Sequence, residues 1–237
     1  MKTKVFIFLA ALFFSAATST AQEAKTMYIM KDGGITHEIA VSDIDSVIFY
    51  KPSISDPEWV MINGVKWATR NVDKPGTFTA KPEDPGMFYR WNSKVGWSST
   101  DPLTPSDGTS TWNNDWDGNG ATAWEKANDP CPPGWRMPNA DELESLLFNY
   151  NSVWTIVNGM RGCRFGSGSN TVFLPAAGVR NDYGTLIDPG SCGIYWSSTQ
   201  SSDGNAYDLS FYSGGADAGT YESWDKTDGL SCRCVAE

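Results

Sequence analysis

The pattern of apolar positions predicts one clear helix, over residues 140–150. Four apolar residues recur at i, i+3, i+4 and i+7 and would share one helix face: Leu143, Leu146, Leu147 and Tyr150. Asn139 can act as the N-cap, and Glu142, three residues later, would complete a capping box. The prolines before Asn139 rule out an earlier start and favour an extended approach to the helix.

Elsewhere the pattern predicts short β-strands separated by turns. Alternation is cleanest at 206–212, which places Tyr207, Leu209 and Phe211 on one face and Asp208, Ser210 and Tyr212 on the other. Asn63 and Gly64 predict a hairpin within 59–72. We expect further strands at 86–91, 153–157, 171–174, 193–199 and 230–235, and a long surface loop over 97–120. Because strands and helices do not alternate, we expect an α+β fold.

The first residues predict export and a small leader. Two lysines precede an apolar run over 5–17 and small residues at 19–21, so 1–21 is interpreted as a secretory signal peptide. The run is too short to span a membrane comfortably, and we expect no membrane insertion after its removal. Residues 22–56 would form a small β leader and linker, with a hairpin turn at 31–34 and a third strand at 46–50. Residues 57–237 would form the main domain.

Composition narrows the possible partners and the compartment. The chain carries 18 Lys and Arg against 28 Asp and Glu, a formal net charge of −10, which argues against nucleic acid and anionic membranes as partners. Eleven tryptophans argue against disorder. The acidic charge suits an exported protein, as the signal peptide indicates, so the expected localisation is periplasmic, cell-surface or secreted.

All five cysteines lie in the second half of the chain, at 131, 163, 192, 232 and 234. In an exported protein, disulfides are the default interpretation, and an odd number leaves at least one cysteine unpaired or intermolecular. Cys131 could join the end of the chain through either Cys232 or Cys234.

Several phrases together resemble the Fibrobacter-type major paralogous domain (FISUMP). They are WATRNV at 67–72, the segment 86–91, CPPGWRMP at 131–138, FLPAAG at 173–178, YWSST at 195–199 and RCV at 233–235. The resemblance covers about three quarters of the chain and implies a C-type lectin-like fold with a Cys131–Cys234 disulfide. Cys232, where that family usually has another residue, is the alternative partner. The leader around 43–49 is similar to N-terminal segments of exported proteins from Gram-negative gut bacteria.

The sequence gives little support to catalysis. The only histidine is His37, in the leader, so the main domain cannot build a Ser-His-Asp or Cys-His site from its own residues. Formylglycine-generating enzymes, which share the fold that the resemblance implies, hold a cysteine pair upstream of their closing phrase. Residues 210–227 contain no cysteine. We therefore expect a non-enzyme, with a formylglycine-generating-like enzyme as a remote alternative.

A calcium site is the one metal site that the sequence suggests, and no other cofactor is expected. Asp115, Asp117 and Asn119, followed by Gly120, copy the first half of an EF-hand loop. The twelfth position is Lys126 instead of an acid. The alternative is a plain turn rich in Asp and Asn.

The predicted ligand-binding surface lies near the end of the chain. Its centre would be Tyr207, Asp208, Tyr212, Tyr221 and Trp224. Residues 212–221 consist of Tyr, Ser, Gly, Ala, Asp and Thr, types that suit adaptable recognition loops. They also match what adenine-directed diversification of asparagine codons produces in variable proteins with a similar fold. A flexible glycine-rich loop is the alternative.

The tryptophans separate into two predicted groups. Trp67, Trp135 and Trp196 are expected in the core, whereas Trp97, Trp112, Trp116 and Trp224 lie in polar loops and are candidate ligand contacts. The resulting hypothesis is an exported, non-catalytic module that recognises a glycan or a protein, with the cell surface as one expected place of display. The alternative is a structural subunit of a surface assembly that uses the leader as a docking strand.

Overall fold

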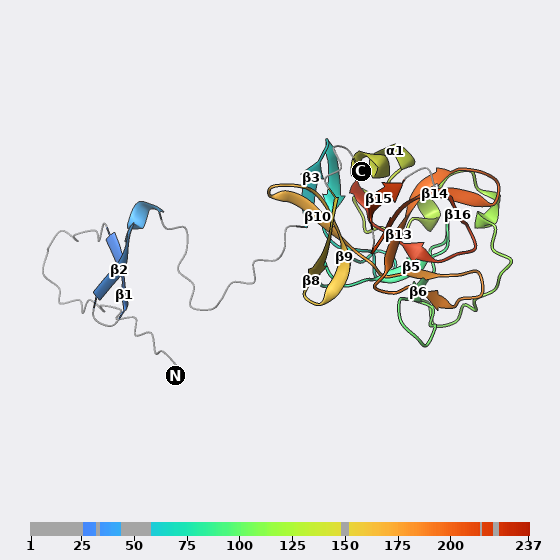
Figure 1. The fold of residues 1–237 in the computed structure, drawn as a ribbon, viewed down its shortest axis with the longest axis horizontal. Coiled ribbons are helices and arrows are strands. Elements are labelled where there is room, and N and C mark those ends of the chain that lie inside the picture. Colours follow the sequence, from blue (N-terminus) through green and yellow to red (C-terminus); the bar gives the residue numbers. More distant parts are fainter. Residues whose placement is uncertain (1–25, 32–33, 44–57, 148–151, 214, 220–222) are drawn as a thin grey trace, which may run out of the picture. The chain divides into compact units, whose positions relative to one another are not determined.

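The computed structural model describes residues 26–31, 34–43, 58–147, 152–213, 215–219 and 223–237. The chain divides into two compact units, Met1–Ser53 and Ile54–Glu237 (Figure 1). The predicted signal peptide at 1–21 and the predicted boundary at 56 lie outside the described residues.

The leader unit contains an antiparallel hairpin. Strand β1 (Thr26–Lys31) pairs with β2 (Gly34–Ala40), and the short 3-10 helix η1 (Val41–Asp43) follows. The hairpin predicted around 31–34 is therefore confirmed. The third strand predicted at 46–50 lies outside the described residues.

The main unit is built around a seven-stranded sheet with the order β15-β14-β13-β17-β5-β6, and β16 also pairs with β14. Its strands are β5 (Met87–Tyr89), β6 (Gly96–Ser98), β13 (Cys192–Gln200), β14 (Asn205–Tyr212), β15 (Gly215–Gly219), β16 (Ser223–Asp225) and β17 (Leu230–Ser231). The pair β13–β17 is parallel, and the other pairs are antiparallel.

Three smaller sheets complete the unit. Their orders are β3-β4-β18-β7, β10-β9-β8 and β11-β12. The strands are β3 (Trp59–Ile62), β4 (Val65–Ala68), β7 (Trp135–Arg136), β8 (Ser152–Val157), β9 (Met160–Ser167), β10 (Asn170–Pro175), β11 (Val179–Arg180), β12 (Leu186–Ile187) and β18 (Val235–Ala236). Asn63 and Gly64 take positive φ values of 49° and 84° and make the predicted β3–β4 turn.

The sequence pattern did not predict β9, because this strand contains glycines that normally weaken a strand. These glycines allow strands β9 and β10 to approach each other closely. A Cβ atom at Gly162 would lie 2.3 Å from the carbonyl oxygen of Leu174 on β10, so only glycine fits there.

Helix α1 (Ala140–Ser145) has the predicted capping box, with Asn139 and Glu142 bonded to each other's backbone. The helix is shorter than the predicted 140–150. The N–H groups of Leu146 and Leu147 bond carbonyls three residues back, which tightens the last turn. The Asn63 side chain then caps the Ser145 carbonyl at 2.7 Å. Tyr150 lies outside the described residues.

Two apolar clusters pack on the seven-stranded sheet. Leu209 and Phe211 of β14 belong to the cluster that includes the helix residue Leu143, whereas Ala206 belongs to the cluster around Trp196. Since side chains alternate along β14, the central strands are buried on both faces. Strands dominate the described residues beside one short α-helix, which is compatible with the expected α+β class.

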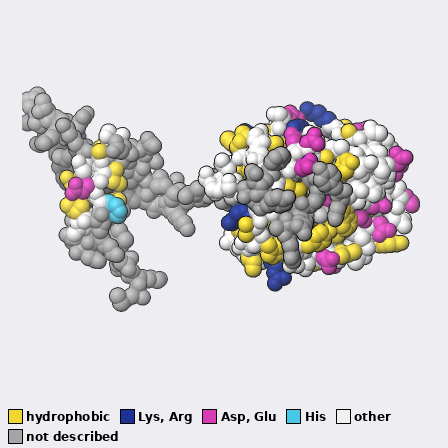
Figure 2. All heavy atoms as spheres, turned by 45° about the horizontal axis from the view of Figure 1, so that its top comes forward, with side chains coloured by type: hydrophobic (Ala, Val, Ile, Leu, Met, Phe, Trp, Pro, Cys, Tyr) yellow, Lys and Arg dark blue, Asp and Glu magenta, His cyan; other side chains and the backbone are white. Residues whose placement is uncertain are grey.

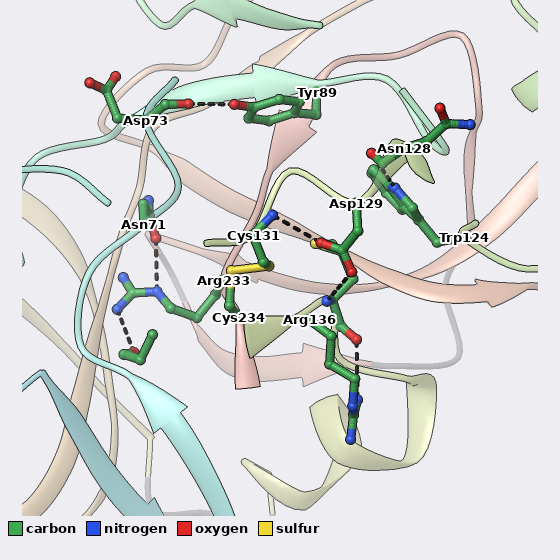
Figure 3. The surroundings of a disulfide bond; sticks show 12 residues. Asn71, Asp73, Tyr89, Trp124, Asn128, Asp129, Cys131, Arg136, Arg233 and Cys234 are labelled. Atoms are coloured by element: carbon green, nitrogen blue, oxygen red, sulfur yellow. Dashed lines mark hydrogen bonds between the residues drawn. A yellow bond between two sulfur atoms is a disulfide. The ribbon is translucent and has the colours of Figure 1, made fainter. Parts of the chain in front are cut away.

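The Cys131–Cys234 disulfide joins the CPPGWRMP segment to the end of the chain, as predicted, with a Cα–Cα distance of 6.1 Å (Figure 3). The alternative partner, Cys232, is a buried free thiol. Between these two cysteines, the fully buried Arg233 donates to Asn71 Oδ1 at 2.9 Å and to the carbonyls of Ala68 and Phe173 at 3.0 Å. The closing segment is thus fixed covalently and by hydrogen bonds.

Candidate functional site

A groove of about 770 Å³ runs beside the disulfide and the short edge strand β7. Its lining combines aromatic, proline and charged residues: Pro75, Gly76, Lys94, Trp124, Lys126, Asp129, Cys131, Pro132, Pro133, Trp135, Arg136, Met137, Asn139, Ser198 and Glu237. A volume of this order suits a small ligand or a short segment of a larger one.

The aromatic walls of the groove are held in place by specific contacts. Trp124 donates its indole N–H to the Asn128 carbonyl at 3.0 Å and packs edge-on against Trp91, with ring centroids 5.9 Å apart. Trp135 packs edge-on against Phe78 at 5.4 Å and keeps part of its surface exposed. The groove is therefore formed before any ligand arrives, which lowers the entropic cost of binding.

Asp129 fixes the backbone on both sides of the disulfide cysteine. Its carboxylate accepts the N–H of Cys131 at 2.9 Å and the N–H of Met137 at 3.0 Å. Burial raises the pKa of this carboxyl, and the two hydrogen bonds oppose that rise. The N–H of Met137, the first residue after β7, is thus already bonded to Asp129. This donor is not free to pair with a further strand.

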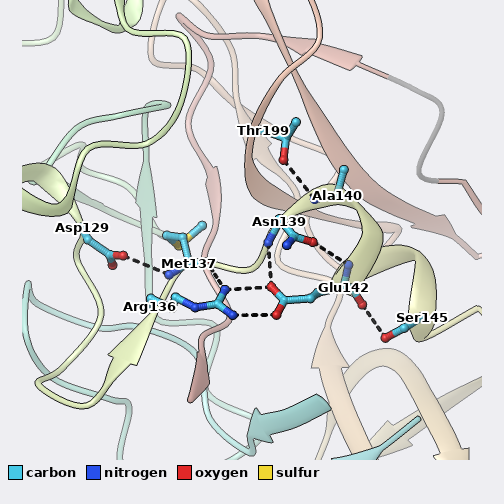
Figure 4. Close-up of polar contacts among 8 residues, drawn as sticks. All are labelled: Asp129, Arg136, Met137, Asn139, Ala140, Glu142, Ser145 and Thr199. Carbon is cyan, nitrogen blue, oxygen red and sulfur yellow. Dashed lines mark hydrogen bonds and ion pairs between the residues drawn. The ribbon is translucent and has the colours of Figure 1, made fainter. Parts of the chain in front are cut away.

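An ion pair joins β7 to helix α1. Arg136 forms two parallel hydrogen bonds with Glu142, at 2.8 and 2.7 Å, and Glu142 also accepts the N–H of Asn139 (Figure 4). The hydrogen bonds with Glu142 raise the pKa of Arg136. Burial acts to raise the pKa of Glu142, but its bonds with Arg136 and Asn139 outweigh burial and lower it. This bidentate pair orients the groove wall.

The remaining charges of the groove are near its exposed rim. Lys126 pairs with Glu237 at 3.0 Å, with side chains 88% and 46% exposed, so this pair adds little stability and can yield to a ligand. Lys94 is exposed. The site offers flat apolar surfaces with polar groups of both signs around them, an arrangement that can bind a polar ligand with apolar patches.

Among the described residues, the structure does not gather all the predicted ligand-binding side chains on one accessible surface. Tyr207 lies on the opposite face of β14 from Asp208 and Tyr212. Trp224 pairs with Ala206 and therefore lies on the same face as Asp208 and Tyr212. Asp208 is completely buried and accepts a hydrogen bond from the Ser210 hydroxyl, so it is not a surface residue.

Only part of that predicted surface is accessible. Tyr212 is 43% exposed, whereas Trp224 is half-buried against the second core cluster. Tyr221 lies outside the described residues. The alternation at 206–212 does not reveal the burial of Asp208, because β14 lies between two cores and is covered on both faces.

The predicted calcium segment forms a turn. Asp117 caps the short 3-10 helix η2 (Gly118–Gly120), and its Oδ1 accepts the N–H of Asn119 at 2.8 Å. Asp115 is exposed. No group of three or more His, Cys, Asp or Glu side chains in the described part of the chain is placed to hold a metal ion. Calcium binding stays a prediction, which a melting-temperature rise in millimolar calcium that Asp117→Ala removes would support.

The tryptophans differ in part from expectation. Trp67 and Trp196 are fully buried, as predicted, but Trp135 lines the groove. Trp97, predicted in a polar loop, lies in β6 and is 4% exposed. The sequence signal that this ring could reach the surface was the Pro133-Gly134 pair beside Trp135, and both residues are exposed in the structure.

Comparisons with known proteins identify one partial match. A family model described as a domain of unknown function (DUF8237) matches residues 166–235. That segment begins in β9 and includes most of the seven-stranded sheet and Cys234. No curated protein and no solved structure matches the chain. Among the described residues, no helix is long and apolar enough to cross a membrane.

Proposed function

We propose that this protein is an exported, non-catalytic binding module with a C-type lectin-like main domain, and that it recognises a glycan or a protein. The disulfide is compatible with an exported protein. Acidic side chains are scattered over the face that Figure 2 shows, and Lys and Arg are few there, which fits a partner other than nucleic acid.

The observation that carries the proposal is the preformed groove beside the disulfide. Trp124 and Trp135 are fixed by partners outside the groove, and Asp129 and the Arg136–Glu142 pair fix its backbone. Aromatic faces stack on the C–H faces of sugars or on peptide side chains, and the charged rim can orient the polar groups of either ligand.

Binding of the full-length mature protein to a glycan array and to extracellular proteins would test the proposal. Trp135→Ala should reduce the binding of a ligand held in the groove at least tenfold, whereas Tyr183→Ala should leave it unchanged. Tyr183 is a matched control, since it is aromatic, 73% exposed and absent from the groove lining. Binding that Tyr212→Ala abolishes and Trp135→Ala does not would move the site to β14. No binding to either class of ligand would contradict the proposal.

A structural role in a surface assembly is the second candidate, and the leader hairpin favours it. Tyr28 and Ile35 expose 52% and 54% of their surface, so the hairpin presents apolar side chains. If the leader docks onto a partner, Ile35→Asp should abolish co-purification of that partner and leave ligand binding by the groove unchanged.

A further inference from the structure

Three arginines of the main unit are almost completely buried, but only two of them have all their nitrogen atoms hydrogen-bonded. Arg233 and Arg180 are each 1% exposed, and Nε, Nη1 and Nη2 of both have acceptors. Arg90 is 3% exposed and bonds only through Nη1, to Asn113 Oδ1 at 3.0 Å. Within the described residues, its Nε and Nη2 have no hydrogen-bond partner.

Three tryptophan rings surround this guanidinium. Its central carbon lies 4.1 Å from the ring centroid of Trp112, 5.8 Å from that of Trp97 and 5.9 Å from that of Trp116. We call these four residues the Arg90 cluster. Cation–π attraction stabilises the charge, although burial lowers the pKa of Arg90 to about 10. The side chain is therefore cationic at neutral pH.

The positions of Trp112 and Trp116 are set by hydrogen bonds to residues outside the cluster. Trp112 donates its indole N–H to the Asp182 carbonyl at 2.7 Å, and Trp116 donates to the Trp91 carbonyl at 2.8 Å. Trp97 packs edge-on against Trp112 at 5.0 Å. Trp112 and Trp116 are only half-buried, and they belong to the segment between β6 and η2. Each of these two rings therefore contacts the buried guanidinium and also keeps part of its surface exposed.

The two nitrogen atoms without partners identify the ligand chemistry. Nε–H and Nη2–H lie side by side on one edge of the planar guanidinium, and two such parallel donors match the two oxygens of a carboxylate. A buried donor without an acceptor is costly and rare in native proteins. The indole rings of the same cluster offer flat faces of the kind that stack on the apolar face of a sugar ring.

We propose that the Arg90 cluster binds the carboxylate of an acidic sugar of the uronic acid type. The carboxylate would occupy the Nε–Nη2 edge of Arg90, and the sugar ring would stack on Trp112 or Trp116 after a side-chain shift of these surface rings. The proposal rests on the glycan form of the proposed function. It assigns acidic sugars a second site, which is formed by residues other than the groove lining.

Titration of the full-length mature protein with glucuronate, followed by tryptophan fluorescence and by melting temperature, tests this assignment. Glucuronate should give a saturable signal, and glucose and acetate should bind at least tenfold more weakly. Arg90→Lys keeps the charge but removes the paired donors, so it should weaken glucuronate binding at least tenfold. Arg164→Lys, on an exposed position of β9, is the matched control and should have no effect.

Further variants separate this site from the groove. Trp112→Leu removes the nearest ring and should also weaken glucuronate binding at least tenfold, which keeps the test valid if Arg90→Lys does not fold. Trp135→Ala should leave glucuronate binding intact. Binding that is lost in Trp135→Ala but retained in Arg90→Lys would place the sugar in the groove and overturn the assignment while the proposed function stands. Absence of any glucuronate binding would also overturn it.

Discussion

Arg233 and Arg90 are both buried arginines, but their hydrogen-bonding surroundings are opposite. Arg233 lies beside the disulfide (Figure 3), and each of its nitrogen atoms has an acceptor within 3.0 Å. Arg90 lies among aromatic rings, and its guanidinium has one hydrogen bond to the described residues. The first guanidinium holds strands together, because backbone carbonyls from β4 and β10 converge on it. The second holds a surface segment and keeps two donors unused.

This difference separates scaffold from candidate site. A fully bonded buried charge rigidifies its surroundings, and no donor is left for a ligand. A buried charge with free donors is tolerated when aromatic rings offset the cost of its desolvation. Such a charge is stabilised most when an anion binds to the free donors. The contrast predicts different responses to the same substitution in the two regions.

Arg233→Met should have the largest effect on stability. The substitution would leave the Ala68 and Phe173 carbonyls and the Asn71 side-chain oxygen buried without their donor. We expect a loss of about 3–5 kcal/mol in the free energy of unfolding, or failure to fold. Urea denaturation measures it, and a loss below about 1 kcal/mol would contradict the scaffold assignment.

Removing the disulfide should have an effect of similar or slightly smaller size. Cys131 and Cys234 are separated by 103 residues, and closing so long a loop stabilises the fold by about 2–5 kcal/mol. The double variant Cys131→Ser with Cys234→Ser should lower the denaturation midpoint accordingly, whereas Cys163→Ala, at a buried free thiol, is a control without the cross-link. Peptide mapping without reduction should recover Cys131 and Cys234 in one linked species, and two free thiols would contradict the assignment.

Asp228 offers a pH-dependent test near the Arg90 cluster. Burial, followed by the charges of Asp225 and Asp182, raises the pKa of Asp228 to about 7. Asp182 also accepts the Trp112 indole N–H through its carbonyl. Because the folded pKa lies above the unfolded value, the stability contributed by the protonated carboxyl is complete below about pH 4 and is lost as pH rises through 7.

Asp228→Asn should therefore stabilise the protein at pH 8 by about 1–2 kcal/mol and have little effect at pH 4. Melting temperatures of both proteins across this range measure the difference. Asp107→Asn provides a contrast in the direction of the pKa shift, since hydrogen bonds from Ser110 lower the pKa of this exposed carboxyl to about 2. Equal shifts at pH 4 and pH 8 for Asp228→Asn would rule out the titration of Asp228 as the cause.

The sequence predicted the scaffold better than the sites, for physical reasons that these residues illustrate. Local chemistry determined the Asn63–Gly64 turn and the capping box of α1, while the resemblance supplied the disulfide. The two-sided burial of Asp208 and the glycine-rich strand β9 depend on neighbours that are distant in the chain. Neither the groove nor the Arg90 cluster has a local signature, because each combines segments that only the fold brings together.

Arg90→Met should have the smallest effect on stability, and it tests the comparison most directly. Methionine keeps an unbranched side chain of similar length and makes favourable contacts with the indole rings of Trp97, Trp112 and Trp116. Within the described part of the chain, the substitution loses one hydrogen bond, to Asn113, which is exposed and can bond water instead. Replacing the guanidinium also removes two buried donors without partners. We therefore expect a change within about 1 kcal/mol, of either sign, in urea denaturation. A loss above about 3 kcal/mol would show that Arg90 is part of the scaffold, like Arg233, and would remove the premise that its free donors are kept for a ligand.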